Sequence, residues 1–315
     1  MTSEQSIRLR IRKLGAADYQ GPAIIAPVIH LMGSQIEAIE ADEFLYNPTK
    51  LAKGLSELRI ALGSNVITCA SSAAMEAEAF GTDIDWSTYP PRVTSALDPS
   101  MVETDDPTNL LLLGERIEAA VECTKRLSST EGSNVALCAA ITSPGKLASE
   151  LTVYDFNNQD EIYKNKLLDF SGRCVTGITR KLCESGINLM ILQELDIFDP
   201  VIDFEAWSSA FIPICNMARF HRVKIVLVLE YNSLENINKI AEVLPMDVSL
   251  CLNKSSWLSS SDKKSHGLVL EKNYQEWSEL PESVSFVTTG SEISVDADIG
   301  ELTQAINKLT RNVEA

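Results

Sequence analysis

Acidic side chains that could exchange protons follow several apolar segments of the sequence. Glu150, Glu194 and Glu230 each lie in the polar stretch after a different apolar run. Carboxylates that crowd together at one site repel one another, so at least one of them should have a raised pKa, which suits a general acid or base. We therefore predict Glu230, Glu194 and Glu150 as catalytic residues.

Other polar residues at comparable positions are candidates for binding a substrate. A histidine there could transfer protons near neutral pH, and an arginine could hold a carboxylate through two hydrogen bonds. The candidate substrate-binding residues are His30, Gln35, Ser72, Glu76, Arg92, Asp196, Asn232 and Ser291.

Histidines and cysteines are too scattered to predict a local metal site. The sequence has 3 His and 7 Cys, no Cys-x-x-Cys pair, and no two His within one helical turn of each other. This pattern favours reduced, mostly buried thiols over a disulfide framework or a zinc site. We expect no bound metal.

The elements that must position these residues alternate between short apolar runs and longer amphipathic stretches. Continuous apolar runs are typical of strands that are buried on both faces. The predicted strands are 23–29, 65–69, 134–141, 188–192, 224–229, 247–252, 267–270 and 283–287. The predicted helices are 48–62, 109–127, 144–151, 161–185, 204–222, 234–244 and 299–310.

Eight buried strands that alternate with helices predict a single α/β domain, a (β/α)8 TIM barrel over residues 1–315, with residues 1–20 as an N-terminal extension. An open doubly wound sheet is the alternative, but no Gly-x-Gly-x-x-Gly turn follows any predicted strand. The segment 83–106 is expected to be a long loop at the carboxyl-terminal ends of the strands, where barrel enzymes place their chemistry.

Composition excludes several classes of partner. With 44 Asp and Glu against 27 Lys and Arg, the formal net charge is −17, and 45% of the residues are hydrophobic. This acidity argues against nucleic acid and anionic membranes, both of which require a basic surface. No apolar run reaches the ~20 residues of a membrane span, and no secretory signal is recognisable. We expect a cytoplasmic protein with a small-molecule substrate, either a monomer or a homodimer.

Four segments resemble one protein family. The segment Ala73–Arg92, AAMEAEAFGTDIDWSTYPPR, is similar to a "VEAEALG…ID…PRV" pattern, and Ala139–Leu151 is similar to "G-P-F-T-L-A". Glu184–Phe198 is similar to "aGaD-x-I-x-x-x-D", and Thr289–Val295 to the start of "G-C-x-I-P-x-x-T-P". These patterns belong to the uroporphyrinogen decarboxylase superfamily, in particular its corrinoid-dependent methyltransferases. The resemblance implies a (β/α)8 barrel, a corrinoid or folate as the cofactor and a corrinoid protein as a partner.

The sequence departs from that family at its functional positions. Where the zinc-dependent members have His-x-Cys, this chain has Glu230-Tyr231-Asn232, and Ser291 stands at the position of the late cysteine. Zinc is therefore not expected. The arginine-rich segment of the decarboxylases falls near Met32–Ile36, which contains no arginine, and their catalytic aspartate falls near Ser72.

Three functions follow as hypotheses. The first is a methyltransferase-like enzyme of one-carbon metabolism that acts on a small, non-anionic substrate, which Glu230 and Asn232 orient while Glu194 or Glu150 acts as acid or base. The second is a decarboxylase or lyase that uses Arg92 to bind a small carboxylic acid. The third is a non-catalytic binding or partner subunit that retains the barrel.

Overall fold

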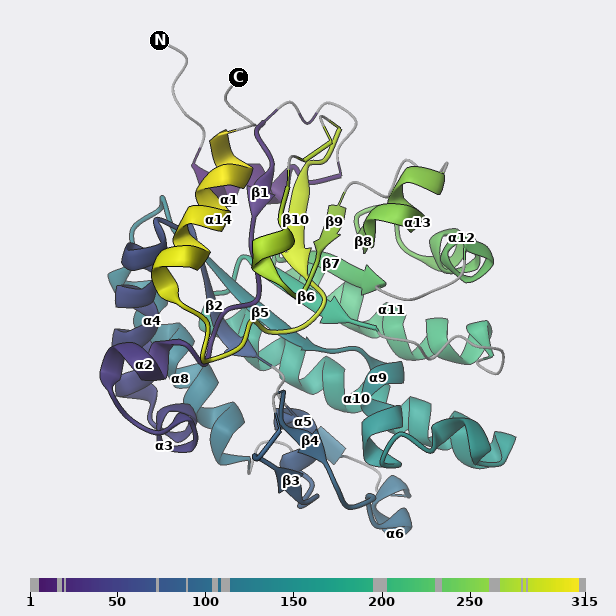
Figure 1. Ribbon diagram of the computed structural model, residues 1–315. Helices are drawn as coiled ribbons and strands as arrows, with labels where there is room; N and C mark the ends of the chain where they lie inside the picture. Colours follow the sequence, from purple (N-terminus) through teal and green to yellow (C-terminus); the bar gives the residue numbers. More distant parts are fainter. Residues whose placement is uncertain are drawn as a thin grey trace.

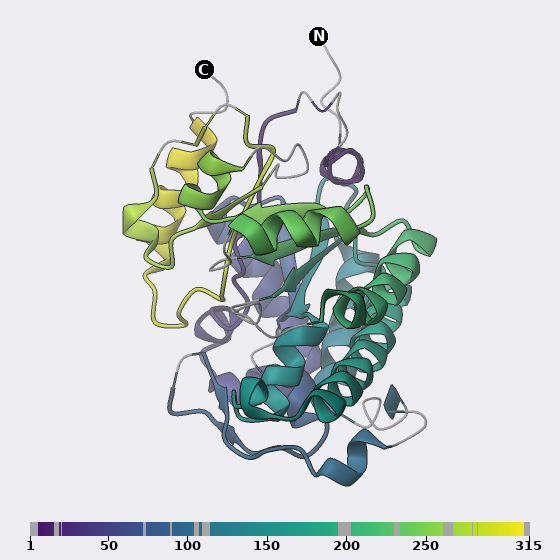
Figure 2. The same cartoon turned by 90° about the vertical axis from the view of Figure 1, so that its right-hand side faces the viewer.

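Eight parallel strands surrounded by helices form a nearly closed barrel (Figure 1, Figure 2). The computed structural model describes residues 6–15, 19, 21–71, 74–88, 90–103, 107–108, 114–194, 203–229, 234–260, 267–278, 280–281 and 283–311. The architecture confirms the predicted (β/α)8 TIM barrel.

The hydrogen-bonded order of the strands is β1-β10-β9-β8-β7-β6-β5-β2, and every neighbouring pair is parallel. The strands are β1 (Ile24–Ile25), β2 (Val66–Ser71), β5 (Ala136–Thr142), β6 (Leu189–Gln193), β7 (Lys224–Leu229), β8 (Ser249–Leu252), β9 (Gly267–Leu270) and β10 (Phe286–Thr289). The carboxyl-terminal ends of these strands therefore meet at one end of the barrel, which we call the mouth.

The first strand is shorter than the sequence predicts. We expected a strand over 23–29, whereas β1 covers only Ile24–Ile25. Ile24, Ala26 and Val28 donate toward β10, so the missing N–H of Pro27 lies on the opposite side of the strand, toward β2, where no ladder forms. The segment stays attached to β10, because the Val28 N–H donates to the Thr289 hydroxyl at 3.0 Å. β1 and β2 are the two ends of the ladder, so the barrel has one seam there.

Six of the seven long helices agree with the predicted ranges to within two residues, whereas α8 covers Glu115–Thr130 where a helix over 109–127 was predicted. Asn47 accepts hydrogen bonds from the first turn of α4, Pro48 occupies its first position, and Gly63 ends it in the left-handed conformation at φ 63°. These helices are α4 (Pro48–Leu62), α8 (Glu115–Thr130), α9 (Pro144–Leu151), α10 (Glu161–Ser185), α11 (Phe204–Phe220), α12 (Leu234–Val243) and α14 (Ile299–Arg311).

Several short elements were not predicted. The segment expected to be a long loop, 83–106, contains an antiparallel pair of strands and a short helix, so that expectation is wrong in part. Their length explains the omission, since two residues carry no recognisable periodicity. The additional elements are α1 (Ile7–Arg12), α2 (Gly33–Glu37), α3 (Ala41–Tyr46), α5 (Met75–Glu78), β3 (Ile84–Asp85), β4 (Arg92–Val93), α6 (Pro99–Val102), η1 (Phe156–Asn158), α13 (Lys254–Ser259) and η2 (Tyr274–Glu276).

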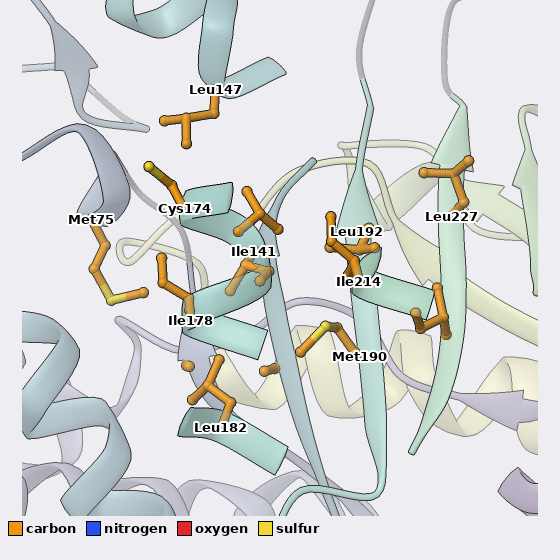
Figure 3. Close-up of a cluster of buried hydrophobic side chains, with 14 of the residues drawn as sticks. Met75, Ile141, Leu147, Cys174, Ile178, Leu182, Met190, Leu192, Ile214 and Leu227 are labelled. Atoms are coloured by element: carbon orange, nitrogen blue, oxygen red, sulfur yellow. The ribbon is translucent and has the colours of Figure 1, made fainter. Parts of the chain in front are cut away.

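The strands separate two layers of core by alternating their side chains. Ala140 and Ile191 pack with the barrel interior, whereas Ile141 and Leu192 pack against the surrounding helices. Figure 3 shows the outer layer, in which Ile141 and Leu192 lie among side chains of α10 and α11, such as Ile178. The seven cysteines are buried and free, as predicted.

The N-terminal helix belongs to this core. Ile7, Ile11 and Leu14 are buried in the same cluster as the inward-facing residues of the barrel. α1 therefore packs against the end of the barrel opposite the mouth (Figure 1). In the part of the chain that the structure describes, no helix is long and apolar enough to cross a membrane.

This packing predicts the effect of truncating α1 side chains. Ile11 is fully buried and Leu9 is 41% exposed. We expect Ile11→Ala to lower the free energy of unfolding by about 2–5 kcal/mol, because it leaves a cavity. The matched control Leu9→Ala should change it by less than about 0.5 kcal/mol. Urea unfolding measures both, and equal effects of the two substitutions would contradict the packing of α1.

Candidate active site

The mouth of the barrel is a polar layer on top of an apolar interior. The two-residue period that turns Val28, Ala140 and Ile191 inward continues to His30, Thr142 and Gln193. In the described residues, the buried carboxyl groups all lie in segments that follow strands of the barrel. They are Glu76 after β2, Glu150 after β5, Glu194 after β6 and Glu292 after β10.

Glu194 is held in a fully buried position at the end of β6. Its backbone N–H donates to the Val228 carbonyl at 3.0 Å, and its Oε2 accepts the Trp207 indole N–H at 2.8 Å. Burial raises the pKa of Glu194 to about 7, although hydrogen bonding from the Ser143 hydroxyl, Trp207 and the backbone at the start of α9 acts in the opposite direction. Glu194 can therefore hold or release a proton near neutral pH.

Glu150 is a second carboxyl group of this kind. It is 5% exposed, and burial raises its pKa to about 7. Lys146, one turn earlier on α9, lies 3.9 Å from Glu150 Oε1 and lowers this pKa, while the negative charge of Glu76 raises it. Burial is thus the main cause of the raised pKa values, and the repulsion expected from the sequence is a smaller effect.

Lys146 and Glu76 connect this region across neighbouring strands. Lys146 Nζ donates to Gln193 Oε1 at 3.1 Å, at the end of β6. The fully buried Glu76 accepts the backbone N–H of Thr142 at 3.0 Å, at the end of β5. The segments after β2, β5 and β6 therefore form one cluster, which we call the β5–β6 site.

Two buried oxygens of the β5–β6 site have no hydrogen-bond partner within the described residues. They are Thr142 Oγ1 and Glu150 Oε2. A buried polar atom without a partner costs about 1–3 kcal/mol. Two such atoms in one cluster indicate a place where water or a ligand with hydrogen-bond donors binds.

His30 lies at the seam between β1 and β2, beside the end of the β5–β6 site that β2 contributes. Its Nδ1 lies 2.8 Å from the carbonyl oxygen of Thr68 in β2. Because a carbonyl only accepts, Nδ1 carries the proton and Nε2 is left as an acceptor in the neutral ring. Burial lowers the pKa of His30, against the opposing effects of Glu292 and the Thr68 carbonyl. The neutral ring thus bridges the seam.

Glu292 supports the same seam. Its Oε1 accepts the backbone N–H of His30 at 3.0 Å, and its Oε2 accepts the hydroxyl of Ser71 at 2.8 Å. One carboxylate therefore joins the segments that follow β1, β2 and β10. His30 and Glu292 have a structural role in addition to any role in binding.

Arg116 is a buried cation near the mouth that sequence reasoning missed. It forms an ion pair with Glu78 at 2.7 Å, and its guanidinium lies 5.1 Å from the centre of the Trp86 ring. Glu78 also accepts the Tyr46 hydroxyl at 2.5 Å, and burial, with a smaller contribution from Glu78, raises the pKa of Tyr46 to about 12. Arg116 lies seven residues before the buried Cys123 on the same face of α8. This helical spacing could have identified Arg116 as a buried position from the sequence.

The structure assembles only part of the predicted site. Glu76, Glu150 and Glu194 lie in or beside the β5–β6 site, and His30 lies at the seam. Ser291 is partly buried next to Glu292, whereas Gln35 is exposed and donates to the Val295 carbonyl, and Arg92 is exposed in β4. Four candidates, Ser72, Asp196, Glu230 and Asn232, lie outside the described residues. Sequence reasoning gave no role to Lys146 or Trp207.

Within the described ranges, no group of three or more His, Cys, Asp or Glu side chains could hold a metal ion. Residues 230 and 232, which stand at the zinc positions of the family resemblance, are outside those ranges. The expectation that zinc does not bind therefore stays a prediction.

The raised pKa values predict how stability depends on pH. A glutamate whose pKa is about 7 when folded and about 4.5 when exposed to water holds its proton more tightly in the native state. The stabilisation that this group contributes to the free energy of unfolding is therefore fully present below about pH 4.5 and is lost as the pH rises through 7. Glu194→Gln should reduce the fall in the free energy of unfolding over this window, by up to about 1.4 kcal/mol per pH unit.

Urea unfolding at a series of pH values from 5 to 8 measures this slope. The control is Glu118→Gln on α8, which removes an exposed carboxylate. If both variants kept the slope of the unchanged protein, Glu194 would not be protonated in the native state near neutral pH.

Comparisons with known proteins support the architecture. No family model and no curated protein matches the sequence. Among solved structures, a methyltransferase from Methanosarcina mazei superimposes with a TM-score of 0.71 at 16% sequence identity, over 97% of this chain and 98% of that chain. At this identity the similarity shows a shared fold over the whole described barrel.

Proposed function

We propose that this protein is a methyltransferase-like enzyme of one-carbon metabolism that acts on a small, non-anionic substrate at the barrel mouth. The observation that carries the proposal is the β5–β6 site. There, two buried oxygens without partners, Thr142 Oγ1 and Glu150 Oε2, lie in the same cluster as two carboxyl groups whose pKa values are about 7.

The chemistry of the site selects the class of substrate. The unpartnered atoms are hydroxyl and carboxyl oxygens, so the complementary ligand presents N–H or O–H donors. An anionic ligand would meet the carboxyl groups of Glu76, Glu150 and Glu194 at low dielectric and would be repelled. Small alcohols, thiols and amines fit these requirements better than carboxylic acids.

Methyl transfer to an acceptor that must lose a proton requires a general base, and these carboxyl groups can act as one. A lone pair of the acceptor atom forms the new bond to the methyl carbon, while the bond from that carbon to the donor atom breaks and the donor atom keeps the electron pair. An acceptor that begins as an alcohol, thiol or ammonium group must lose a proton. Glu194 or Glu150 can take that proton as a general base, or protonate the leaving atom as a general acid in the reverse direction.

Two further observations support the proposal of a methyltransferase-like enzyme. The Methanosarcina mazei protein with the same fold is a methyltransferase, and the segment Ala73–Arg92 resembles corrinoid-dependent methyltransferases. On this proposal Glu230 and Asn232 orient the substrate, a corrinoid or folate carries the methyl group, and a corrinoid protein is a partner that docks at the mouth.

The alternative functions have less support. A decarboxylase or lyase would need a cation to hold its substrate, but Arg92 is exposed, and Lys146 and Arg116 already lie beside carboxylates. A non-catalytic binding subunit would explain the unpartnered oxygens, but it would not require carboxyl groups that titrate near pH 7.

A methyl-transfer assay distinguishes these functions. The assay uses methylcobalamin or methyltetrahydrofolate with a panel of small alcohols, thiols and amines, and follows the methylated product. We expect transfer to at least one neutral or cationic acceptor, and a rate lowered about 10²-fold or more in Glu194→Gln or Glu150→Gln. Glu118→Gln serves as the control with an unchanged rate.

The outcomes that contradict the proposal are specific. Unchanged turnover in both glutamine variants would show that these carboxyl groups are not the acid or base. Release of carbon dioxide from a small carboxylic acid would favour the decarboxylase. Calorimetric binding of an acceptor without transfer from either donor would favour the non-catalytic subunit.

Trp207 provides a separate test, because it positions Glu194. Trp207→Phe keeps an aromatic ring on α11 and removes the N–H that donates to Glu194 at 2.8 Å. This hydrogen bond favours the ionised carboxylate, so its loss should move the pH–rate profile upward by about one unit. A lower rate with an unmoved profile would mean that the indole has only a packing role.

A further inference from the structure

A basic groove lies at the end of the barrel opposite the mouth. Its volume is about 490 Å³, and its walls come from the end of α1, the turn from α11 into β7, and the turn before β8. Its charged residues are Arg12, Arg219, Arg222, Lys224 and Asp247. This end also carries the exposed side chains of Met246 and Phe220, which are 80% and 81% exposed.

The charge of the groove is opposite to that of the whole protein. The chain has 44 acidic and 27 basic residues, whereas the groove is lined by four basic residues and one acidic residue. The sequence pattern of this region, Arg219–Lys224, concentrates cations within six positions at the end of α11. An acidic protein that gathers cations in one concave place creates a local attraction for anions.

Most of these cations have no carboxylate partner. Arg219 holds Asp247 through two hydrogen bonds, at 2.7 and 2.9 Å. Within the described residues, Arg12, Arg222 and Lys224 form no ion pair. The single carboxylate of the groove, Asp247, therefore pairs with Arg219 and also attracts Lys224, so four cations share one negative charge.

Lys224 is the strongest of these observations, because it is buried. Only 9% of the residue is exposed, and its Nζ donates to the backbone carbonyl of Asp247 at 2.5 Å. Burial lowers the pKa of Lys224 to about 8, against the attraction of the Asp247 carboxylate, which Arg219 also holds. An anion in the groove would add negative charge beside Lys224, which shares Asp247 with Arg219.

Arg222 adds evidence from the backbone. It follows α11 in the left-handed conformation, with φ 60°. The chain places glycine in this conformation after α4 and α10, at Gly63 and Gly186, although Ala38 also adopts it after α2. A side chain in that conformation costs about 1–2 kcal/mol more than glycine. Attraction to the carboxyl end of α11 offsets part of this cost, but it does not account for the groove or for Lys224.

We propose that this groove binds a multivalent phosphate anion, such as pyrophosphate or the phosphate tail of a nucleotide. Guanidinium groups bind phosphate oxygens through paired hydrogen bonds, and an ammonium group acts as a compact charge beside them. Two arginines and one lysine match an anion with more than one phosphate group. The site is independent of the function proposed for the mouth.

Thermal unfolding of the full-length protein in the presence of inorganic pyrophosphate tests the proposal. The comparison solution is sodium chloride at equal ionic strength, which removes general screening effects. We expect pyrophosphate at millimolar concentration to raise Tm in a saturable manner, since a ligand that binds the native state stabilises it. ATP and ADP, used in separate arms, show whether a nucleotide binds more tightly than the free anion.

Arg222→Gly separates a ligand role from a structural role. It removes the guanidinium and relieves the backbone conformation, so without anion the variant should unfold at an equal or higher temperature. We expect calorimetry to show that this variant binds pyrophosphate at least about tenfold more weakly than the unchanged protein. Lys224→Met, which keeps the length of the buried side chain, should also weaken binding.

Lys308→Ala is the matched control. Lys308 is an exposed cation in the last part of α14, outside the groove, so its removal changes the net charge by the same amount. We expect it to leave pyrophosphate binding unchanged. The proposal is overturned if pyrophosphate has no more effect than sodium chloride, or if Arg222→Gly and Lys224→Met bind it as tightly as the control. The proposal is also overturned if an acidic peptide binds saturably while pyrophosphate, ATP and ADP do not bind.

Discussion

Alternation of side chains along the parallel strands is the constraint on which both the core and the mouth of this barrel depend. A strand turns successive residues to opposite faces, so Ala140 fills the interior while Ile141 packs against the helices. The same register carries Thr142 to the last inward position, where the interior meets the loops. A slip of one residue would exchange the two layers and turn the mouth residues away from one another.

Burial at the mouth then determines the chemistry. The Glu194 and Glu150 carboxyl groups lose their water, and that loss, more than repulsion, raises their pKa values toward neutrality. Trp207 and Lys146 limit the effect, because an N–H donor and an ammonium group both favour the ionised carboxylate. The site therefore keeps two groups that can exchange protons, at a cost in stability that a ligand with donors would reduce.

The seam between β1 and β2 shows how a nearly closed barrel is held where the ladder is interrupted. Pro27 removes a donor from the first strand, and side chains take over the connection. His30 reaches the Thr68 carbonyl across the seam, and Glu292 joins the neighbouring segments. The residues that close the barrel thus stand beside those proposed to do chemistry, so the geometry of the mouth depends on the closure of the seam.

The sequence by itself determined the barrel and most of its long elements. Pro48 and Gly63 mark the ends of α4, and continuous apolar runs indicate buried strands, because these signals arise from local backbone geometry and burial. It also indicated that Glu150 and Glu194 belong to the mouth. Only the tertiary structure decided which partners these groups have: Trp207 and Lys146 reach them from separate elements, and no local pattern encodes such contacts. The basic groove likewise exists only because folding brings the end of α1 beside the turn that carries Arg222.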